Sequence, residues 1–253
     1  MSNDLTKLSS DRASENNQLR TALLDSVTHE FRTPLTSIKA AITALLTDSY
    51  ARPSERNELL SIINDEADRL NRLVGEALDC SRFDTRVKLD LRPHTILSII
   101  NAAKADCRTL LGARLLSIQL DDALPLVRAD LHKTKKALVQ LLENAIKYSP
   151  SDEPITITAT SDGTLASVSV IDRGSGIADS EQELILERFY RGKNHQRLVD
   201  GTGMGLSIAT AIIKAHGGSL KVRSQHNRGS TFSFTLPVYR RSSERGRASN
   251  TSC

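Results

Sequence analysis

Apolar residues in the first third of the chain recur at steps of three or four, a pattern typical of amphipathic helices that pack lengthwise on other helices. The first stripe consists of Leu24, Val27, Phe31, Leu35, Ile38, Ile42 and Leu45. The segment TDSYARPSE then breaks the pattern, and Ser54 precedes a second stripe. Its members are Leu59, Ile63, Ala67, Leu70, Val74 and Ala77. The pattern predicts two long helices joined as a hairpin within residues 1–86.

A helical hairpin by itself cannot cover two full apolar stripes. We therefore expect two copies of the chain to pair as a four-helix bundle, which makes the protein a homodimer. The alternative is that the stripes pack on the remainder of the same chain.

The pattern changes near Val87, from helical stripes to short alternating segments. VKLDL, at 87–91, alternates like a strand, and helices are expected at about 95–111, 131–148 and 205–216. PITITAT and LASVSVID read as strands joined by a turn at 161–163, and SLKVRSQ with STFSFTLPV reads as a closing hairpin. Residues 87–240 are thus predicted to form an α+β layered domain, so the fold class is α+β throughout.

Composition excludes several classes of protein. Apolar residues make up 39% and charged residues 25% of the 253 residues, as in soluble globular proteins. No apolar run approaches the ~20 residues of a membrane helix, and the N-terminus has no apolar signal-peptide core. The cysteines at 80, 107 and 253 show neither metal-ligand spacing nor an obvious pairing, which favours a reducing, cytosolic environment.

The net charge of +4 arises mainly from the C-terminal tail. Four arginines against one glutamate after Tyr239 give +3, so the body of the chain is nearly neutral. A Ser- and Arg-rich terminus is typical of a disordered tail, and residues 241–253 are assigned to one. With 4% aromatic residues and no tryptophan, platforms for stacking bases are scarce, so no nucleic-acid partner is expected.

The segment VTHEFRTPLTSIKAA places His29 on the first helix, about 200° away from Val27 and Phe31. This histidine therefore faces solvent rather than the apolar stripe. Glu30 can orient the imidazole and leave one ring nitrogen as a nucleophile. Pro34 cannot donate a backbone hydrogen bond, so the helix is expected to bend or loosen below the histidine. Such a residue can also be a surface side chain without a role.

Three later segments suit a nucleotide. In ALVQLLENAIKYSP, Asn144 and Lys147 lie one turn apart, which places a hard oxygen ligand and a cation on one helix face. In IDRGSGI, a carboxylate at the end of a strand, Asp172, can accept from an exocyclic amine, which favours adenine. In GTGMGLSIA, glycines precede a helix and can wrap phosphates with backbone N–H groups. Each motif is weak alone.

Between the last two segments lies ERFYRG. Its Phe189 and Tyr190 are expected to anchor a lid over the nucleotide, and Arg188 or Arg191 to face phosphate.

Together these segments carry a family resemblance. HEFRTPL resembles the phosphoacceptor box of bacterial sensor histidine kinases. The later segments resemble, in order and spacing, the N, G1, F and G2 boxes of the histidine-kinase ATP-binding domain, and the ending HGGSLKVRS with RGSTFSFTLP is also similar. The resemblance covers roughly residues 19–238. The wording around His29 and Asn144 is most similar to the potassium- and turgor-sensing group.

The resemblance implies a two-layer α/β sandwich that binds ATP and Mg²⁺, with autophosphorylation on His29 and transfer to an aspartate of a response-regulator receiver domain. It implies that Glu30 orients His29 and acts as base, that Thr33 supports dephosphorylation of the regulator, and that Asn144 contacts the metal. The implied nucleotide-binding residues are Asn144, Lys147, Tyr148, Asp172, Gly174, Gly176, Arg191, Gly201, Thr202, Gly203, Gly205, Leu206 and Thr231.

The sequence departs from the family pattern at two points. Gln140 stands where the family usually has Asn, which puts metal contact from this position in doubt. No sensor domain or membrane helix is evident, so the chain is interpreted as the cytosolic catalytic portion of a longer kinase, of the kind that includes membrane-attached sensors. Two alternatives are an ATP-hydrolysing relative of the gyrase and MutL type and a non-catalytic dimerisation scaffold. Gln140 cannot serve as the hydrolase's base, and the intact His29, Asn144 and Asp172 argue against the scaffold.

Overall fold

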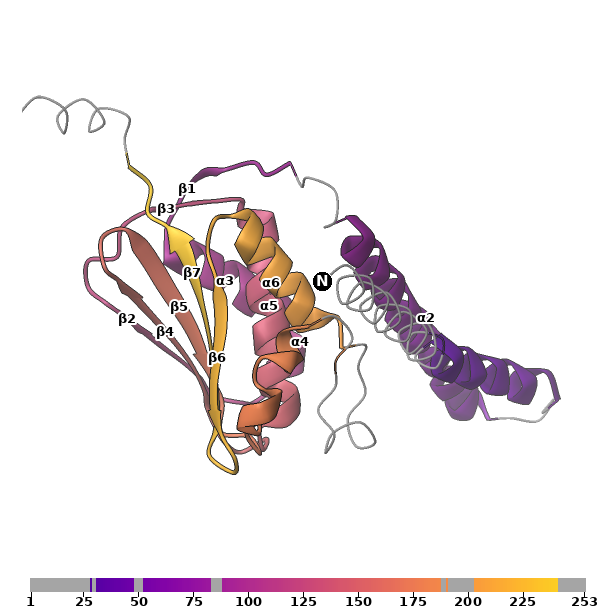
Figure 1. Cartoon of the computed structure of the whole chain (residues 1–253). Coiled ribbons are helices and arrows are strands. Elements are labelled where there is room, and N and C mark those ends of the chain that lie inside the picture. Colours follow the sequence, from indigo (N-terminus) through magenta and orange to yellow (C-terminus); the bar gives the residue numbers. More distant parts are fainter. Residues whose placement is uncertain are drawn as a thin grey trace, which may run out of the picture. The chain divides into compact units, whose positions relative to one another are not determined.

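The structure is a computed structural model that describes residues 28, 31–47, 52–82, 88–187, 190 and 203–240, with side chains undescribed over 76–82. The chain divides into a first unit, residues 1–79 with 200–204, and an α+β unit, residues 80–199 with 205–253, and each is described by itself. Figure 1 shows the helices of the first unit and the layered second unit. The predicted fold class, a helical hairpin followed by an α/β sandwich, is confirmed.

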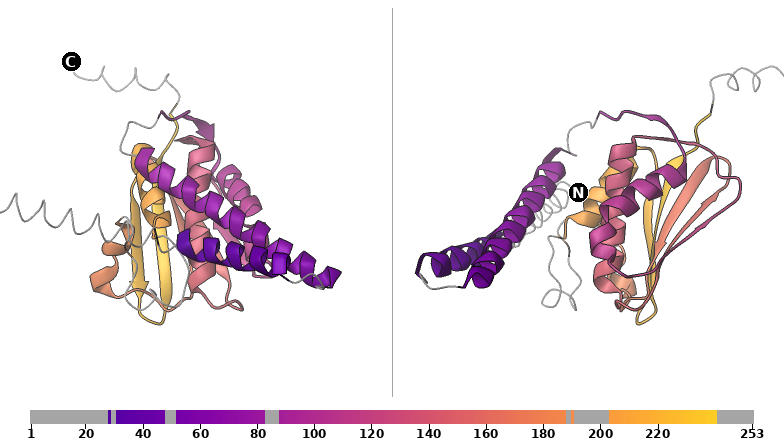
Figure 2. Two further views of the ribbon diagram at one scale, coloured as in Figure 1. Left: turned by 90° about the vertical axis from the view of Figure 1, so that its right-hand side faces the viewer. Right: turned by 180° about the vertical axis from the view of Figure 1, so that it is seen from behind.

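The first unit is a hairpin of two helices that run alongside each other (Figure 2). The described part of the first helix is continuous over 31–47, through the buried Pro34. The second helix, α2, spans Pro53–Arg82. Its first residue is Pro53, and proline suits the first helical position. The backbone N–H of Arg52 donates to Glu55 Oε2 at 3.1 Å, which closes this helix end.

Few apolar side chains of the hairpin are buried. Ala41 and Leu73 lie inside, whereas Leu35 is 54% and Leu46 78% exposed. Ile42, Leu60 and Val74 are also exposed. Leu46 and Leu60 lie beside the predicted stripes, whereas Leu35, Ile42 and Val74 are members of them, so the two stripes are only partly covered in the single chain.

The second unit is built on a five-stranded sheet in the order β2-β4-β5-β7-β6. Strands β2 and β4 pair in parallel, and the other neighbours are antiparallel. The strands are β2 Leu116–Leu120, β4 Ile155–Ser161, β5 Leu165–Ile171, β6 Leu220–Gln225 and β7 Gly229–Pro237. A separate two-stranded ladder joins β1 Arg92–His94 to β3 Val127–Ala129.

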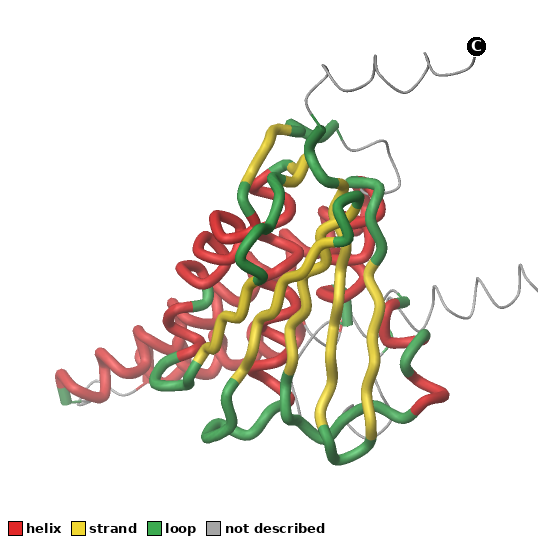
Figure 3. The backbone as a smooth tube through the Cα atoms, turned by 90° about the vertical axis from the view of Figure 1, so that its left-hand side faces the viewer, coloured by secondary structure: helices red, strands yellow, loops and turns green. Residues whose placement is uncertain are grey.

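Helices cover one face of this sheet, as Figure 3 shows from the opposite side. They are α3 Ile96–Asp106, α4 Arg108–Leu111, α5 Leu131–Tyr148 and α6 Gly205–Ala215, with short 3₁₀ turns at Asp179–Glu181 and Leu184–Leu186. Leu138 and Leu141 of α5 are fully buried with Phe232 and Phe234 of β7. The other sheet face carries hydroxyl side chains, such as Ser169 and Ser233, whose oxygens lie 2.8 Å apart.

The start of α5 is held from two sides. Asp130 caps the helix by accepting from the N–H of Lys133 at 3.1 Å. Its own N–H donates to His216 Nε2 at 3.0 Å, so the proton of the neutral imidazole is on Nδ1, which lies 2.8 Å from the carbonyl of Ile212. His216 thereby links the end of α6 to the beginning of α5.

Two expectations about local structure were wrong. The alternating residues Lys88–Leu91 are not a strand; the ladder forms one step later, at Arg92–His94. The reason is that the N–H of Asp90 donates to the carboxylate of Asp130, and the partner strand β3 is only three residues long. The helix expected at 95–111 is interrupted at Cys107, which divides it into α3 and α4.

Candidate nucleotide and phosphoacceptor sites

Asp172 follows the last residue of β5 and is 4% exposed. Its Oδ1 accepts from the N–H of Gly174 at 2.8 Å and from the N–H of Ser230 at 3.2 Å. Burial raises the pKa of this carboxyl, although the two backbone hydrogen bonds act in the opposite direction. No donor to Oδ2 is present among the described residues, so this oxygen remains able to accept from a ligand.

Glycines bring the backbone tightly around this carboxylate. A side chain at Gly174 would collide with the carbonyl of Tyr148, at the end of α5. A side chain at Gly229, where φ is +90°, would collide with the carbonyl of Asp172. The end of α5, the turn after β5 and the start of β7 are therefore in close contact.

Strand alternation on β7 separates two neighbouring residues. Ser230 is buried on the same face as Phe232, and its backbone N–H reaches Asp172. Thr231, the residue proposed from the sequence, pairs with Ile171 and lies on the other face. Sequence reasoning missed Ser230 and Gly229. The alternation of buried residues along STFSFTLP was the signal that identifies Ser230 as the inward position.

A hydroxyl network supports Ser230 from the neighbouring strand. Ser224 Oγ donates to the carbonyl of Gly229 at 2.8 Å and accepts from the N–H of Ile177 at 2.8 Å. The hydroxyls of Ser224 and Ser230 lie 3.0 Å apart. Gln182 donates to the carbonyl of Ser224 at 2.9 Å. The chain after Gly176 is thus fastened to β6.

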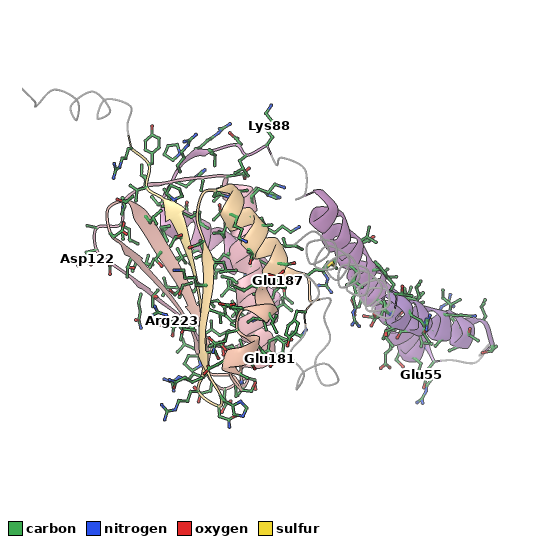
Figure 4. The ribbon with its side chains drawn as sticks, viewed as in Figure 1. Glu55, Lys88, Asp122, Glu181, Glu187 and Arg223 are labelled. Atoms are coloured by element: carbon green, nitrogen blue, oxygen red, sulfur yellow. The ribbon has the colours of Figure 1, made fainter. Side chains whose placement is uncertain are left out.

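A cavity of about 550 Å³ lies at this end of the sheet. It includes Asp172, Ser230 and Thr231 together with two cations, Arg223 and Arg228. Figure 4 shows Arg223 on β6. Thr231 therefore borders the same hollow as Asp172, although it points from the other side of its strand.

The residues proposed on α5 lie outside its fully buried stripe. The helix buries Leu138, Leu141, Leu142 and Ala145, which leaves Asn144 half-buried and Lys147 exposed. Lys147 Nζ lies 5.4 Å from the centre of the Tyr148 ring. Within the described part of the chain, no side chain or backbone group hydrogen-bonds the Asn144 amide.

Gly205, the last glycine of GTGMG, lies next to Gln140 of α5. A side chain at Gly205, the first residue of α6, would collide with Gln140 Oε1. The Gln140 amide donates to Glu143 Oε2 at 3.1 Å. Gly203 has a φ of +66°, and Leu206 is half-buried. The structure therefore brings Gly205 and the helix that carries Asn144 together.

The segment predicted to act as a lid is described only in part. Tyr190 donates its hydroxyl proton to Glu181 Oε1 at 2.9 Å (Figure 4 labels Glu181). Gly176, where φ is +71°, lies against the carbonyl of Gln225. Arg188, Phe189 and Arg191 lie outside the described residues, as do Gly201 and Thr202.

His29 and Glu30 also lie outside the described residues. Thr33, one turn further along, is exposed on the first helix. An exposed face of this helix carries Arg32, Leu35, Thr36, Lys39, Thr43 and Thr47 around a shallow hollow.

The described residues include neither a membrane-spanning helix nor a cluster of metal-ligating side chains. None of the described helices combines the length and the apolar character needed to cross a bilayer. The same residues contain no group of three or more His, Cys, Asp or Glu side chains arranged to hold a metal.

Comparison with known protein families identifies both units. Residues 19–86 match the His Kinase A (phospho-acceptor) domain. Residues 129–240 match the histidine kinase-, DNA gyrase B-, and HSP90-like ATPase domain.

Curated relatives agree with these matches. The chain is 32% identical over 251 residues to the adaptive-response sensory kinase SasA of Synechocystis. The aligned region covers 95% of this chain and 65% of that protein. It is 30% identical over 234 residues to the sensor protein SrrB of Staphylococcus aureus, covering 90% of this chain and 40% of that protein. The chain therefore spans between two fifths and two thirds of the length of these relatives.

Solved structures share the fold. The Acinetobacter baumannii histidine kinase AdeS matches with a TM-score of 0.67 at 22% identity, over 84% of this chain and 98% of that one. The structure of ThkA in complex with the response regulator protein TrrA matches with a TM-score of 0.66 at 22% identity. The match covers 92% of this chain and 67% of that one. The structure of full-length ShkA in complex with AMPPNP matches with a TM-score of 0.64 at 24% identity. The match covers 89% of this chain and 47% of that one.

The phosphoacceptor match lies on the helical hairpin and the ATPase match on the sheet domain around Asp172, in the order that the sequence motifs predicted. The narrower resemblance to potassium- and turgor-sensing kinases stays a prediction. The chain belongs to the bacterial two-component sensor histidine kinases.

Proposed function

We propose that this chain is an ATP-dependent protein-histidine kinase, which phosphorylates its own His29 and passes the phosphoryl group to an aspartate of a response-regulator receiver domain. The observation that carries the proposal is Asp172. It is a buried carboxylate with one oxygen held by two backbone N–H groups and the other able to accept from a ligand. Such a group suits the exocyclic amine of adenine.

Other residues surround this contact. Ser230 and the close-packed backbone at Gly174 and Gly229 shape the base pocket. Lys147 supplies a point charge for phosphate, and we assign backbone N–H groups of 201–206 to the remaining phosphate oxygens. The ShkA complex supports nucleotide binding in this fold, since its nucleotide AMPPNP is an ATP analogue.

The donor set fits Mg²⁺. The Asn144 amide oxygen is a hard ligand without a partner among the described residues, whereas Gln140 donates its amide N–H to Glu143 and its Oε1 lies against Gly205. We therefore assign the metal contact to Asn144 alone. When bound, Mg²⁺ would neutralise phosphate charge and take its remaining ligands from phosphate oxygens and water.

The phosphoryl transfer takes place between ATP and a side chain of the chain itself. One ring nitrogen of His29 attacks the γ-phosphorus, an N–P bond forms, and the P–O bond to ADP breaks. Glu30 holds the proton at the other ring nitrogen and so keeps the attacking lone pair available. Most of the rate enhancement would come from positioning and charge neutralisation.

The hairpin supports two protein partners. Its partly covered apolar stripes support a homodimer through a four-helix bundle. The exposed face around Arg32, Thr36 and Lys39 adjoins His29 in sequence and suits a receiver domain, and the ThkA–TrrA complex shows this type of partner for a relative. We assign regulator dephosphorylation to Thr33. Because ATP and receiver domains are cytosolic, we place these domains in the cytoplasm.

Incubation with γ-labelled ATP tests the proposal. The expected result is label on the protein that is lost in acid and stable in base. His29→Gln should bind nucleotide with unchanged affinity in calorimetry and carry no label. Label that persists undiminished on His29→Gln contradicts the assignment. Release of phosphate without labelled protein would favour the hydrolase alternative, and neither activity would favour the scaffold.

A further inference from the structure

The two edges of the five-stranded sheet differ in how they are protected. At one edge, β6 presents the exposed cations Lys221 and Arg223. At the other edge, β2 has the sequence LSIQL and carries no charge. Charged side chains are a common protection of an edge strand against pairing with other chains, so β2 lacks the protection that β6 has.

The register of β2 shows which backbone groups are open. The carbonyl of Leu115 accepts from Ile155, and the N–H of Asp121 donates to Ala159. Alternate residues of a strand point to opposite sides, so the odd-numbered positions face β4 and the N–H and C=O groups of Leu116, Ile118 and Leu120 face outward. In the described chain, β4 is the sole strand paired with β2, which lies at the sheet edge in Figure 1.

A cationic cleft adjoins the beginning of this edge. It has a volume of about 560 Å³ and lies between α3, α4 and the first residue of β2. Its apolar lining includes Leu111, Leu115 and Leu116, of which Leu115 is 69% exposed. Its cations are Lys104, Arg108 and Arg114.

The positive charge of the cleft is not neutralised within the described residues. Neither Lys104 nor Arg108 forms an ion pair there, and Arg114 donates to the carbonyls of Ile146 and Ser149 rather than to a carboxylate. The nearest acidic neighbour in sequence, Asp106, is paired with Lys135. Three positive charges therefore adjoin an apolar floor and an open strand edge.

We propose that the β2 edge and this cleft bind an extended segment of a partner protein, in which acidic and apolar residues alternate, by β-strand addition. The segment would exchange backbone hydrogen bonds with Leu116, Ile118 and Leu120. Its carboxylates would lie near Lys104 and Arg108, and its apolar side chains would cover Leu115. A second copy of β2 is a poor occupant because it would bring a second set of the same cations.

The first experiment uses a synthetic peptide of about eight residues in which Glu alternates with Val, capped at both ends and titrated into the full chain. We expect a dissociation constant below about 100 μM at low salt, weakening as salt is raised. Hydrogen exchange should slow at the amides of Ile118 and Leu120. A peptide with Lys in place of Glu should bind at least about tenfold more weakly.

N-methylated peptides distinguish strand addition from charge attraction alone. Two peptides are made, one methylated at the backbone nitrogens of its odd-numbered residues and the other at those of its even-numbered residues. Methylation leaves the charge of both peptides unchanged. Only alternate N–H groups of an added strand point toward β2. The peptide methylated at the other N–H groups should therefore keep its affinity, and the peptide methylated at the groups that point toward β2 should lose it. Equal affinity of both would overturn the proposal, and this test requires no change in the protein.

Charge reversal provides the complementary test. Lys104→Glu with Arg108→Glu should weaken the Glu-containing peptide by about tenfold or more. Lys221→Glu, at the opposite edge, is the matched control and should leave binding unchanged. Equal weakening by the control, absence of binding at about 1 mM, or protection at β6 instead of β2 would overturn the proposal. Tighter binding of a single-stranded oligonucleotide, lost in the same double variant, would assign the cleft to nucleic acid instead.

Discussion

The hairpin and the ATP-binding domain use their apolar residues in opposite ways. In the domain, Leu141 and Phe232 are fully enclosed by elements of the same chain. In the hairpin, Leu35 and Leu46 are more than half exposed. The domain therefore contains its complete core, whereas the hairpin requires another surface to bury its stripe. The stability of the hairpin should depend on protomer concentration, and that of the domain should not.

The sharpest test of the domain's self-sufficiency is Gly229→Ala. The added methyl group would collide with the carbonyl of Asp172 at a φ of +90°, so we expect the unfolding free energy of the domain to fall by about 3–5 kcal/mol. Gly163→Ala is the matched control, because its φ is +82° and its methyl group would meet no atom within 4 Å. Thermal unfolding should show a much larger loss for the first variant, with helical signal from the hairpin retained. Equal losses of unfolding free energy in the two variants would mean that the positive φ, and not the collision with Asp172, causes the destabilisation.

The corresponding test of the hairpin is Ile42→Asp with Leu46→Asp. Each exposed apolar side chain that becomes buried in a dimer contributes about 1.5–3 kcal/mol, so the dissociation constant should rise at least about a hundredfold. Sedimentation equilibrium measures this change, and the unfolding transition of the ATP-binding domain should not move. Thr43→Asp adds charge to another exposed position of the same helix and serves as control. An unchanged dissociation constant would mean that Ile42 and Leu46 do not lie in the dimer interface.

Asp172→Asn separates ligand binding from stability within the domain. Loss of a charged hydrogen bond to adenine is worth roughly 1.5–3 kcal/mol, which corresponds to about 10- to 150-fold weaker nucleotide binding in calorimetry. The nucleotide-free domain should be no less stable, because the substitution removes a buried charge. Unchanged affinity would exclude Asp172 from the pocket.

The pKa of Asp172 gives this variant a pH signature. Burial raises the pKa above the usual 3.8, so the folded state favours the protonated carboxyl. The stabilising contribution is therefore complete below pH 3.8 and is lost as pH rises through the raised pKa. Across this window the difference in unfolding free energy between the Asn variant and the parent should grow in favour of Asn. A constant difference would contradict the raised pKa.

The smallest expected effect is that of Thr33→Ala in the hairpin. We expect autophosphorylation to stay within about a few-fold, since the proposed role of Thr33 is removal of phosphate from the regulator. Loss of phosphate from the regulator should slow by a larger factor. Both rates are measured on one preparation at a temperature where the variant is folded. Parallel losses would indicate a structural role near Pro34.

Much of the fold could be predicted where one local signal dominates. The predicted helix 131–148 agrees with α5 because Asp130 caps an amphipathic pattern that ends at Ser149. The strands β4 and β5 were placed within a residue of their observed bounds because alternation and a glycine turn coincide there. The strand expected at 87–91 failed because a distant carboxylate, that of Asp130, takes the backbone N–H of Asp90.

The site was harder to predict because its contacts join residues far apart in the sequence. Asp172, Gly174 and Asn144 are recognisable from local motifs. The bond from Ser230 to Asp172 spans 58 residues, and nothing local in GSTF distinguishes Ser230 from Thr231 except the face of the strand. The contact between Gln140 and Gly205 likewise depends on how α6 packs on α5.

That contact also couples the choice of residue at two positions. A methyl group at position 205 would meet Gln140 Oε1, the far end of a flexible side chain, so Gly205→Ala requires that side chain to turn aside. With the shorter Asn at position 140, the same change has more room. The cost of Gly205→Ala should therefore be smaller when residue 140 is Asn than when it is Gln.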